Sequence, residues 1–342
     1  MLYGVKVNIQ YDTFMISKKD YLAMKLMIIF YFFNLLFLST LAQRGFYKSV
    51  EENARLPGPA IMSLVMICAV AKNEDLYIEE WIDYHFYLGF DIIQIYDNSV
   101  NASKKLVSLS HQYDNKVRIL HYIGLSKQVH AYKNCIEQYV EEKAWVAFID
   151  VDEFIVLRKH SSVRELLQEI VPNGGALSLS RITYGNNGHM HYNNTPVVNR
   201  FTRRKKEIDI YVKTIAYLPD VRRQELHFVR LFNNKYGIDC HGKSIKAAVH
   251  YNPNEDIAVI NHYITKSYDE FRLKRKRGHA YSSHRNSQYH SEIAEQIIRS
   301  EFQRINNNSN VLVDTRARDF FLAHKAPQKS QNSPTTTDAN VD

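Results

Sequence analysis

Two aspartates, Asp150 and Asp152, follow a short apolar stretch that begins at Trp145, and their spacing allows both to act on one ligand. Residues i and i+2 of an extended chain point to the same side, and ligands of α/β sheets bind at the carboxyl ends of strands. Hard divalent cations prefer oxygen ligands and keep positions open for phosphate oxygens. The pair therefore predicts a metal–diphosphate site, with solvated loop acids as the alternative. Alternation turns Glu153 away from the pair and predicts a structural role for it.

Polar residues also follow two earlier apolar stretches. If these stretches are strands of the same sheet, their polar residues gather at the edge that carries the aspartate pair and can bind a ribose or a base. No Gly-x-Gly-x-x-Gly turn follows the first stretch and no Gly-Lys-Ser/Thr loop is present, which disfavours a dinucleotide-binding Rossmann site and a P-loop nucleotidase. The residues concerned are Asn73 and Glu74 in the first case, and Asp97 and Asn98 in the second.

A second polar group lies far downstream, where His262 follows an apolar run and Lys266 comes four residues later. A neutral imidazole can complete a metal sphere that is otherwise made of oxygens. The ammonium group of Lys266 can meet a diphosphate. We therefore expect His262 as a metal ligand and Lys266 as a donor contact, with a purely structural role as the alternative for each.

The elements that must position these residues can be inferred from the apolar pattern. Continuous apolar runs are typical of strands covered on both faces, and apolar residues at helical spacing between them indicate crossover helices. Their alternation predicts an α/β fold with right-handed βαβ units on a mostly parallel sheet. From 189 to 261 only short strands and loops are expected, as in a region built for a ligand. We expect strands at 63–70, 90–96, 117–122, 145–149 and 176–182, and helices at 78–88, 103–113, 128–142, 161–170, 269–277 and 292–305.

The composition is that of a globular protein: 45% of the 342 residues are hydrophobic, 23% are charged and the net charge is +8. Two basic clusters, residues 203–206 and 272–277, are interpreted first as solvated faces. Nucleic-acid binding is disfavoured because these clusters carry no interleaved aromatic residues on a recognisable module. Cys68 and Cys135 are predicted to be buried thiols, and the number and spacing of the cysteines argue against a disulfide scaffold and a structural zinc site.

An uncharged apolar run occupies residues 26–42, and its length is at the lower limit for a membrane-spanning helix. The lysines that precede it favour a cytoplasmic amino terminus and a lumenal body. A cleaved signal peptide from residue 24 and a buried core helix are the alternatives. The expected organisation is a cytoplasmic segment 1–20, a transmembrane signal-anchor 21–43, a stem 44–62, a globular domain 63–325 and a disordered tail 326–342.

Several short motifs, taken in order, resemble those of glycosyltransferase family 92 and of related family-2-like sequences with the GT-A fold. The resemblance covers roughly residues 63–280, and it departs from the family pattern at 184–188, where Phe-Gly-Ser-Ser-Gly is more common. It implies a GT-A-type domain in a type II membrane protein. It also implies an inverting transfer of a hexose, most often galactose, from a UDP-sugar to a glycan, with Mn²⁺ or Mg²⁺ as cofactor. The motifs are Ala-Lys-Asn-Glu-Asp at 71–75, Glu-Glu-Trp-Ile-Asp-Tyr-His at 79–85, Ile-Tyr-Asp-Asn at 95–98, the 145–154 stretch, Tyr-Gly-Asn-Asn-Gly at 184–188, and Ile-Asn-His-Tyr-Ile-Thr-Lys-Ser at 260–267.

With this resemblance, Asp152 is expected to ligate the metal directly, while Asp150 contacts the ribose or a metal-bound water. An inverting transferase needs a general base for the acceptor hydroxyl. The candidates are Glu225, His227 and Asp220, in the loop-rich region. For the acceptor sugar we expect contacts from the loop that contains Tyr184, Asn186, Asn187 and His189, for which an ordinary tight turn is the alternative.

Two other classes of protein stay open. One is a nucleotidyl- or phosphotransferase that uses the same metal–diphosphate site, and the other is a carbohydrate-binding, transferase-like protein without catalysis. The location expected for the globular domain is the lumen of a Golgi- or ER-like compartment, or the outside of the cell if residues 24–42 are cleaved.

Overall fold

The computed structural model describes residues 63–278 and 293–325. The cytoplasmic segment, the signal-anchor, the stem and the tail that the sequence predicts all lie outside the described residues, as does the run 26–42. Among the residues that the structure describes, no helix has the length and apolar character needed to cross a bilayer. The membrane anchor therefore stays a prediction.

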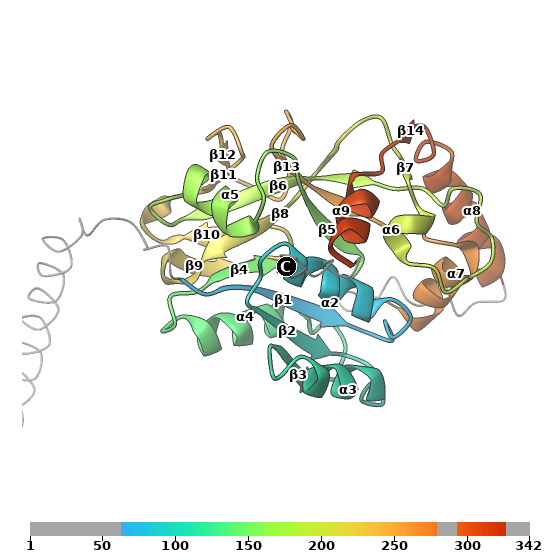
Figure 1. Ribbon diagram of the computed structural model, residues 1–342, viewed down its shortest axis with the longest axis horizontal. Helices are drawn as coiled ribbons and strands as arrows, with labels where there is room; N and C mark the ends of the chain where they lie inside the picture. Colours follow the sequence, from blue (N-terminus) through green and yellow to red (C-terminus); the bar gives the residue numbers. More distant parts are fainter. Residues whose placement is uncertain (1–62, 279–292, 326–342) are drawn as a thin grey trace, which may run out of the picture. The chain divides into compact units, whose positions relative to one another are not determined.

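Four parallel strands form the first half of the central sheet, in the spatial order β4-β1-β2-β3 (Figure 1). Helices connect them, so the predicted series of βα units is confirmed. Gly89, at a φ of +93°, lies just after the first of these helices and ends it, as expected. The elements are β1 (Val65–Ala71), α2 (Ile78–Tyr87), β2 (Ile92–Asp97), α3 (Lys104–Gln112), β3 (Val117–His121), α4 (Gln128–Tyr139) and β4 (Trp145–Phe148).

Apolar side chains cover both faces of these strands, as continuous apolar runs require. On one face Ile67 of β1 packs in the same cluster as Trp81 of α2. On the other face Met66 packs in a second cluster that includes Tyr132 of α4. Neighbouring residues of β1 thus enter different layers, which fixes the register of the strand and the position of the loop that follows it.

The second half of the sheet corrects the expectation of a mostly parallel arrangement. A long strand, β8 (Asp209–Tyr217), runs antiparallel between β4 and β6 (Ala176–Thr183). A further strand, β5 (Glu153–Leu157), follows the aspartate pair at once and pairs antiparallel with β13 (Ala258–His262). Neither β5 nor β8 was expected from apolar runs, because polar residues alternate with apolar ones along β8 and β5 is separated from β4 by only a short turn. The sheet is mixed.

The remaining elements surround this sheet. The predicted helices at 161–170, 269–277 and 292–305 are confirmed within a few residues, and the region 189–261 holds short strands as expected, apart from β8, one four-residue α-helix and two 3-10 helices. The carboxyl-terminal helix was not predicted. These elements are α5 (Val163–Ile170), α6 (Val197–Arg200), β7 (Arg203–Arg204), η1 (Leu218–Asp220), β9 (Val221–Gln224), β10 (Val229–Leu231), η2 (Phe232–Asn234), β11 (Gly237–Ile238), β12 (Ser244–Ile245), α7 (Tyr268–Arg277), α8 (Ala294–Asn306), β14 (Leu312–Val313) and α9 (Arg316–Lys325).

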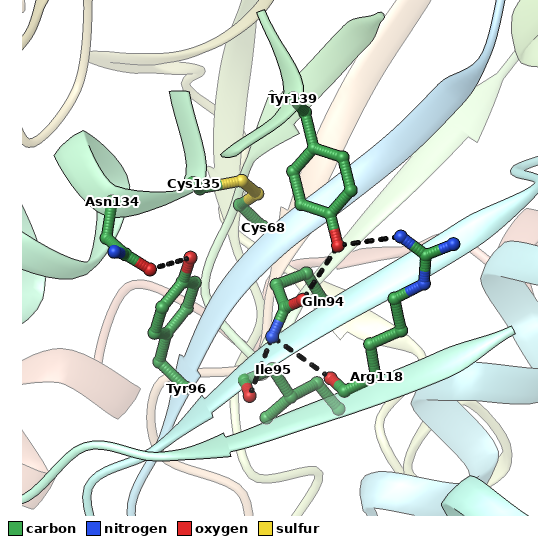
Figure 2. The surroundings of a disulfide bond; sticks show 8 residues. All are labelled: Cys68, Gln94, Ile95, Tyr96, Arg118, Asn134, Cys135 and Tyr139. Atoms are coloured by element: carbon green, nitrogen blue, oxygen red, sulfur yellow. Dashed lines mark hydrogen bonds between the residues drawn. A yellow bond between two sulfur atoms is a disulfide. The ribbon is translucent and has the colours of Figure 1, made fainter. Parts of the chain in front are cut away.

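A disulfide joins Cys68 in β1 to Cys135 in α4, which corrects the prediction of two buried thiols (Figure 2). Both residues face the same apolar layer between the sheet and α4, with their Cα atoms 6.6 Å apart. The two positions are 67 residues apart in the chain, so only the packing of α4 on β1 brings them together. Cys240 is buried and has no disulfide partner among the described residues.

Candidate active site

A pocket of about 960 Å³ lies at the carboxyl ends of β1, β4 and β13, where ligands of α/β sheets bind. Its volume falls within the usual range for small-molecule sites, roughly 300–1,000 Å³. Charged side chains dominate its lining. The basic ones are Lys72, Arg181, Lys213, Lys274, Arg275, Arg277 and Arg304, and the acidic ones are Glu74, Asp150, Asp152, Asp209 and Glu301.

Asp150 and Asp152 both line this pocket, from the short turn between β4 and β5. Both oxygens of Asp150 are already engaged. Its Oδ1 accepts a hydrogen bond from Nε2 of Gln128 at 2.7 Å, and its Oδ2 accepts one from Nζ of Lys213 at 2.8 Å. Burial alone would raise the pKa of the Asp150 carboxyl, but the Lys213 ammonium more than offsets it and the pKa is lowered. Asp150 is therefore a paired anion at neutral pH.

Lys213 is the fixed counterion beneath the pocket. Only 1% of its side chain is exposed, and its Nζ also lies 3.2 Å from Oε2 of Glu153. Burial would lower the pKa of Lys213, but the two carboxylates outweigh burial and raise it. Glu153 is fully buried, accepts a hydrogen bond from the backbone N–H of Asp150 at 3.0 Å, and lies 3.4 Å from Arg181. Glu153 thus holds the turn that carries Asp150.

Asp152 has different partners. Its Oδ2 accepts a hydrogen bond from the ammonium group of Lys274, in α7, and lies 3.4 Å from Nε2 of His262, at the end of β13. Burial opposes ionisation of Asp152, but Lys274 and then His262 hold its pKa well below the usual range. The structure therefore brings Asp152 and His262, far apart in the sequence, to one point of the pocket.

These residues fit a divalent cation only as a two-ligand site. Asp152 and His262 offer one oxygen and one nitrogen side by side, whereas both oxygens of Asp150 are engaged. The described part of the chain contains no cluster of three or more His, Cys, Asp or Glu side chains arranged for a metal. Mg²⁺-like sites often use one or two protein ligands and complete the sphere with phosphate oxygens and water. The pair fits such a site, provided that Lys274 leaves Asp152.

The four residues expected at the nucleotide differ in position. Glu74 lines the pocket, where it pairs with Arg277, and the backbone carbonyl of Asn73 accepts a hydrogen bond from Arg277 at 2.8 Å. Asp97 and Asn98 are buried and do not line the pocket. The Asp97 carboxylate accepts hydrogen bonds from two backbone N–H groups, at 3.0 and 2.8 Å, and the Asn98 amide donates to two carbonyls, at 2.8 and 3.0 Å. Through these hydrogen bonds, the Asp97 and Asn98 side chains hold the loops behind the carboxyl edge of the sheet.

Lys266 is also turned away from the pocket. It is 2% exposed, its backbone has a φ of +51°, and its Nζ lies 3.9 Å from the ring centroid of Tyr77. This cation–π contact holds the ammonium over an aromatic face. The lysine that reaches Asp152 is instead Lys274, eight residues further along the chain.

The loop expected to bind the acceptor lies outside the pocket lining. Tyr184 is 1% exposed and packs on the ring of Tyr263. The backbone N–H of Asn187 donates to the side chain of Asn310 at 2.9 Å, and Asn186 accepts from the Asn310 amide at 3.1 Å. The polar groups of this loop hold the segment after α8. His189 packs edge-on against Phe201, and it does not reach the pocket.

Of the three candidate bases, only His227 lines the pocket. Burial, and then the nearby Lys213, lower its pKa to about 4, so the imidazole is neutral at physiological pH. Glu225 forms ion pairs with Arg223 at 3.1 Å and Arg230 at 3.7 Å, outside the lining. Asp220 accepts a hydrogen bond from the backbone N–H of Gly175 at 2.6 Å, at the opposite end of β8.

Strand β8 supplies pocket residues that the sequence analysis missed. Asp209, Tyr211 and Lys213 all line the pocket, because alternate residues of a strand share a face. The period of two in Asp-Ile-Tyr-Val-Lys, residues 209–213, was the signal that could have identified them. Oδ2 of Asp209 accepts a hydrogen bond from Oγ1 of Thr183 at 2.6 Å, and 44% of Tyr211 is exposed.

The two basic clusters are not uniformly solvated. In α7, Lys274, Arg275 and Arg277 line the pocket, whereas Arg272 pairs with Glu295 on another side. In the cluster 203–206, Arg204 is buried and pairs with Glu255 and Asp314, at 3.1 Å each. Ion pairs with acidic residues that are distant in the sequence hold several of these basic side chains inside the fold.

Comparison with known proteins gives one family. A family model described as glycosyltransferase family 92 matches residues 64–299. A glycosyltransferase family 92 protein of Arabidopsis thaliana is 26% identical over 239 residues, which cover 66% of this chain and 39% of that protein. One of Oryza sativa is 23% identical over 213 residues, covering 61% and 34%. The chain thus spans about two fifths or less of the length of these relatives.

Similarity to solved structures is weak. A mannosyltransferase from Pyrobaculum calidifontis in complex with GDP-Man and Mn²⁺ aligns over 80% of this chain and 78% of its own, with a TM-score of 0.36 and 11% identity. S. aureus TarS in complex with UDP aligns over 46% and 47%, with a TM-score of 0.30 and 15% identity. These values are too low to carry an argument about the site.

Proposed function

The chain belongs to glycosyltransferase family 92, whose model matches residues 64–299, and from this premise we propose that it transfers a hexose from a UDP-sugar to a glycan. The resemblance found in the sequence is thereby confirmed. The observation that carries the proposal is the convergence of Asp152, His262 and Lys274 in a large, highly charged pocket at the carboxyl edge of the sheet. We propose galactose as the sugar and a GT-A-type arrangement of the domain.

The donor diphosphate is assigned to the end of the pocket that contains Lys72, Lys274 and Arg277. These cations match its negative charge, and burial followed by the charge of Arg277 lowers the pKa of Lys72. Asp152 and His262 would hold Mn²⁺ or Mg²⁺, which neutralises charge on the departing diphosphate when it is bound. Asp150 is held by Lys213 and lines the pocket, where its carboxylate can accept a hydrogen bond from the ribose or from a metal-bound water.

The acceptor is assigned to the face formed by β8. Tyr211 is exposed in the pocket beside the His227 ring, with 5.7 Å between the ring centroids, and an aromatic face of this kind suits the apolar face of a sugar. Asp209 or His227 takes the proton from the acceptor hydroxyl as its oxygen attacks the anomeric carbon and UDP leaves. Of the two we favour Asp209, because it lines the pocket from β8 together with Tyr211, to which the acceptor is assigned.

A lumenal location is part of the proposal. The disulfide between Cys68 and Cys135 is typical of proteins that fold in an oxidising compartment. The predicted anchor at 21–43 would place the domain there.

Hydrolysis of UDP-sugars, in the absence of an acceptor, tests the proposed reaction. The full chain should release UDP slowly from UDP-galactose with Mn²⁺ and not with EDTA. Asp152→Asn should abolish the release, and Asp256→Asn, which changes an exposed acid outside the pocket, should leave it unchanged. Release of UMP would identify a nucleotidyltransferase instead. Binding of UDP-galactose with no turnover, in the presence of glycan acceptors, would identify a carbohydrate-binding protein without catalysis.

A further inference from the structure

The two aspartates of the pocket have counterions of different kinds. Lys213, the partner of Asp150, is enclosed by Asp150 and Glu153 with 1% of its side chain exposed. Lys274, the partner of Asp152, has 20% of its side chain exposed and faces the open pocket. One counterion is therefore fixed in the protein, and the other has room to move.

Lys274 competes for the same oxygen that a metal would use. Its ammonium donates to Oδ2 of Asp152, and the same oxygen lies 3.4 Å from Nε2 of His262. A divalent cation between Asp152 and His262 would meet the ammonium at short range. Two cations cannot share one buried oxygen without strong repulsion, because Coulomb interactions are weakly screened there.

The helix that carries Lys274 is firmly held, so the side chain can move without the backbone. Ser267 and Glu270 form a capping box at the start of α7. Glu270 also makes two hydrogen bonds to Arg200, at 2.7 and 2.9 Å, and both side chains are buried. A lysine has a flexible four-carbon stem, and from this anchor its ammonium can reach other parts of the pocket.

We propose that Lys274 is an exchangeable counterion. Without donor it neutralises Asp152, and when a divalent cation and a nucleoside diphosphate bind, its ammonium moves from the carboxylate to a diphosphate oxygen. The carboxylate thus always has a positive partner, which avoids the cost of an unpaired buried charge. This inference rests on the proposed function, because it needs a metal at Asp152 and a diphosphate in the pocket.

A single substitution of Lys274 should have effects of opposite sign on the affinities for Mn²⁺ and for UDP. In Lys274→Met the competitor for Asp152 is gone, so Mn²⁺ should bind more tightly in the absence of nucleotide. The same variant lacks the ammonium for the diphosphate, so UDP should bind more weakly in the presence of Mn²⁺. We expect each change to be on the order of tenfold, which corresponds to about 1.4 kcal/mol.

The experiment is a calorimetric titration of the full chain with Mn²⁺ alone and with UDP in saturating Mn²⁺. Lys276→Met is the matched control, since Lys276 lies in the same helix but pairs with Glu295 at 3.5 Å and does not line the pocket. Both affinities of this control should equal those of the unmutated chain. Lys274→Arg, which keeps the charge, should restore most of the UDP affinity. Thermal melts of both Lys274 variants show whether each keeps the fold.

The outcomes separate the inference from the proposed function. If Lys274→Met and the unmutated chain bind Mn²⁺ and UDP equally well, Lys274 is structural and the inference is wrong. If both affinities fall together, Lys274 supports the site without competing for Asp152, and the exchange is also excluded. If the unmutated chain itself binds no Mn²⁺ with or without UDP, the metal-dependent function fails before the variant is considered.

Discussion

Removal of the disulfide between Cys68 and Cys135 should lower the stability of the domain without changing its fold. The two sulfurs lie in an apolar layer between β1 and α4, and the surrounding side chains include Tyr96 and Tyr139 (Figure 2). Two alanines fit the same layer, so the replacement leaves the packing largely intact. The main loss is the restraint that the cross-link places on the unfolded chain.

The magnitude follows from the length of the closed loop. The cysteines are 67 residues apart, and the loop-entropy relation gives about 3 kcal/mol for 15 residues and about 4.7 for 100. The expected loss is therefore about 4 kcal/mol in the free energy of unfolding. With a urea slope of about 3 kcal/mol/M, the midpoint should fall by roughly 1.3 M.

Urea unfolding of the double variant Cys68→Ala/Cys135→Ala measures this loss. Cys240→Ala is the matched control, since Cys240 is also buried but forms no disulfide within the described residues. The fall in the urea midpoint of this control gives the loss of stability caused by the smaller side chain alone. Reduction of the unmutated chain should lower the midpoint by a similar amount. A double variant no less stable than the control would refute the reasoning, because the bond would then restrain nothing.

Three further outcomes are expected. Burial lowers the pKa of His85 to about 3, so between pH 6.5 and 3 the imidazole binds a proton only in the unfolded chain. The free energy of unfolding should therefore be highest above pH 6.5 and fall by up to about 1.4 kcal/mol per pH unit as the pH drops. His85→Phe should remove this pH-dependent contribution in urea titrations. Lys213→Met leaves Asp150 without its counterion and Glu153 with Arg181 alone, and should cost about 3–5 kcal/mol in urea unfolding. Asp209→Asn should lower kcat by about 100-fold or more while the Kd of UDP is unchanged, because the residue acts on the acceptor proton.

The parallel half of the sheet could be predicted because its strands are buried on both faces and therefore uniformly apolar. β1 and β4 have this pattern, and the loops after them were located correctly. β8 escaped prediction because one of its faces lines a polar pocket, so Asp209, Tyr211 and Lys213 interrupt the apolar run. A strand that builds a charged site does not have the sequence pattern of a core strand.

The candidate site was predictable only where it lies at strand ends. Asp152 and His262 were placed together from this rule, and the structure brings them within 3.4 Å. Lys274 could not be chosen from the basic run 272–277, because its neighbours differ only in which side of α7 they occupy. Lys266 seemed the better cation from its spacing, yet the ring of Tyr77 holds its ammonium away from the acids.

Polar loop residues were the least predictable. Asp97 and Asn98 have the chemistry of nucleotide ligands, but both are buried and already hydrogen-bonded to nearby backbone N–H and carbonyl groups. The Asn186 side chain accepts a hydrogen bond from Asn310, after α8, and the Asn187 side chain donates to Thr202 and accepts from the backbone N–H of Arg203. A sequence motif does not show whether a side chain is free for a ligand or occupied by its own chain.

A titration of UDP into the full chain and its Asp152→Asn variant, with Mn²⁺ and with EDTA, tests the central claim most directly. Asp152 lies in the pocket beside His262, and its replacement removes the charge that would hold the metal while keeping the shape of the side chain. The account predicts that the unmutated chain binds UDP more tightly with Mn²⁺ than with EDTA, and that the variant shows no such difference. An Asp152→Asn variant whose UDP affinity still rises with Mn²⁺ would contradict it.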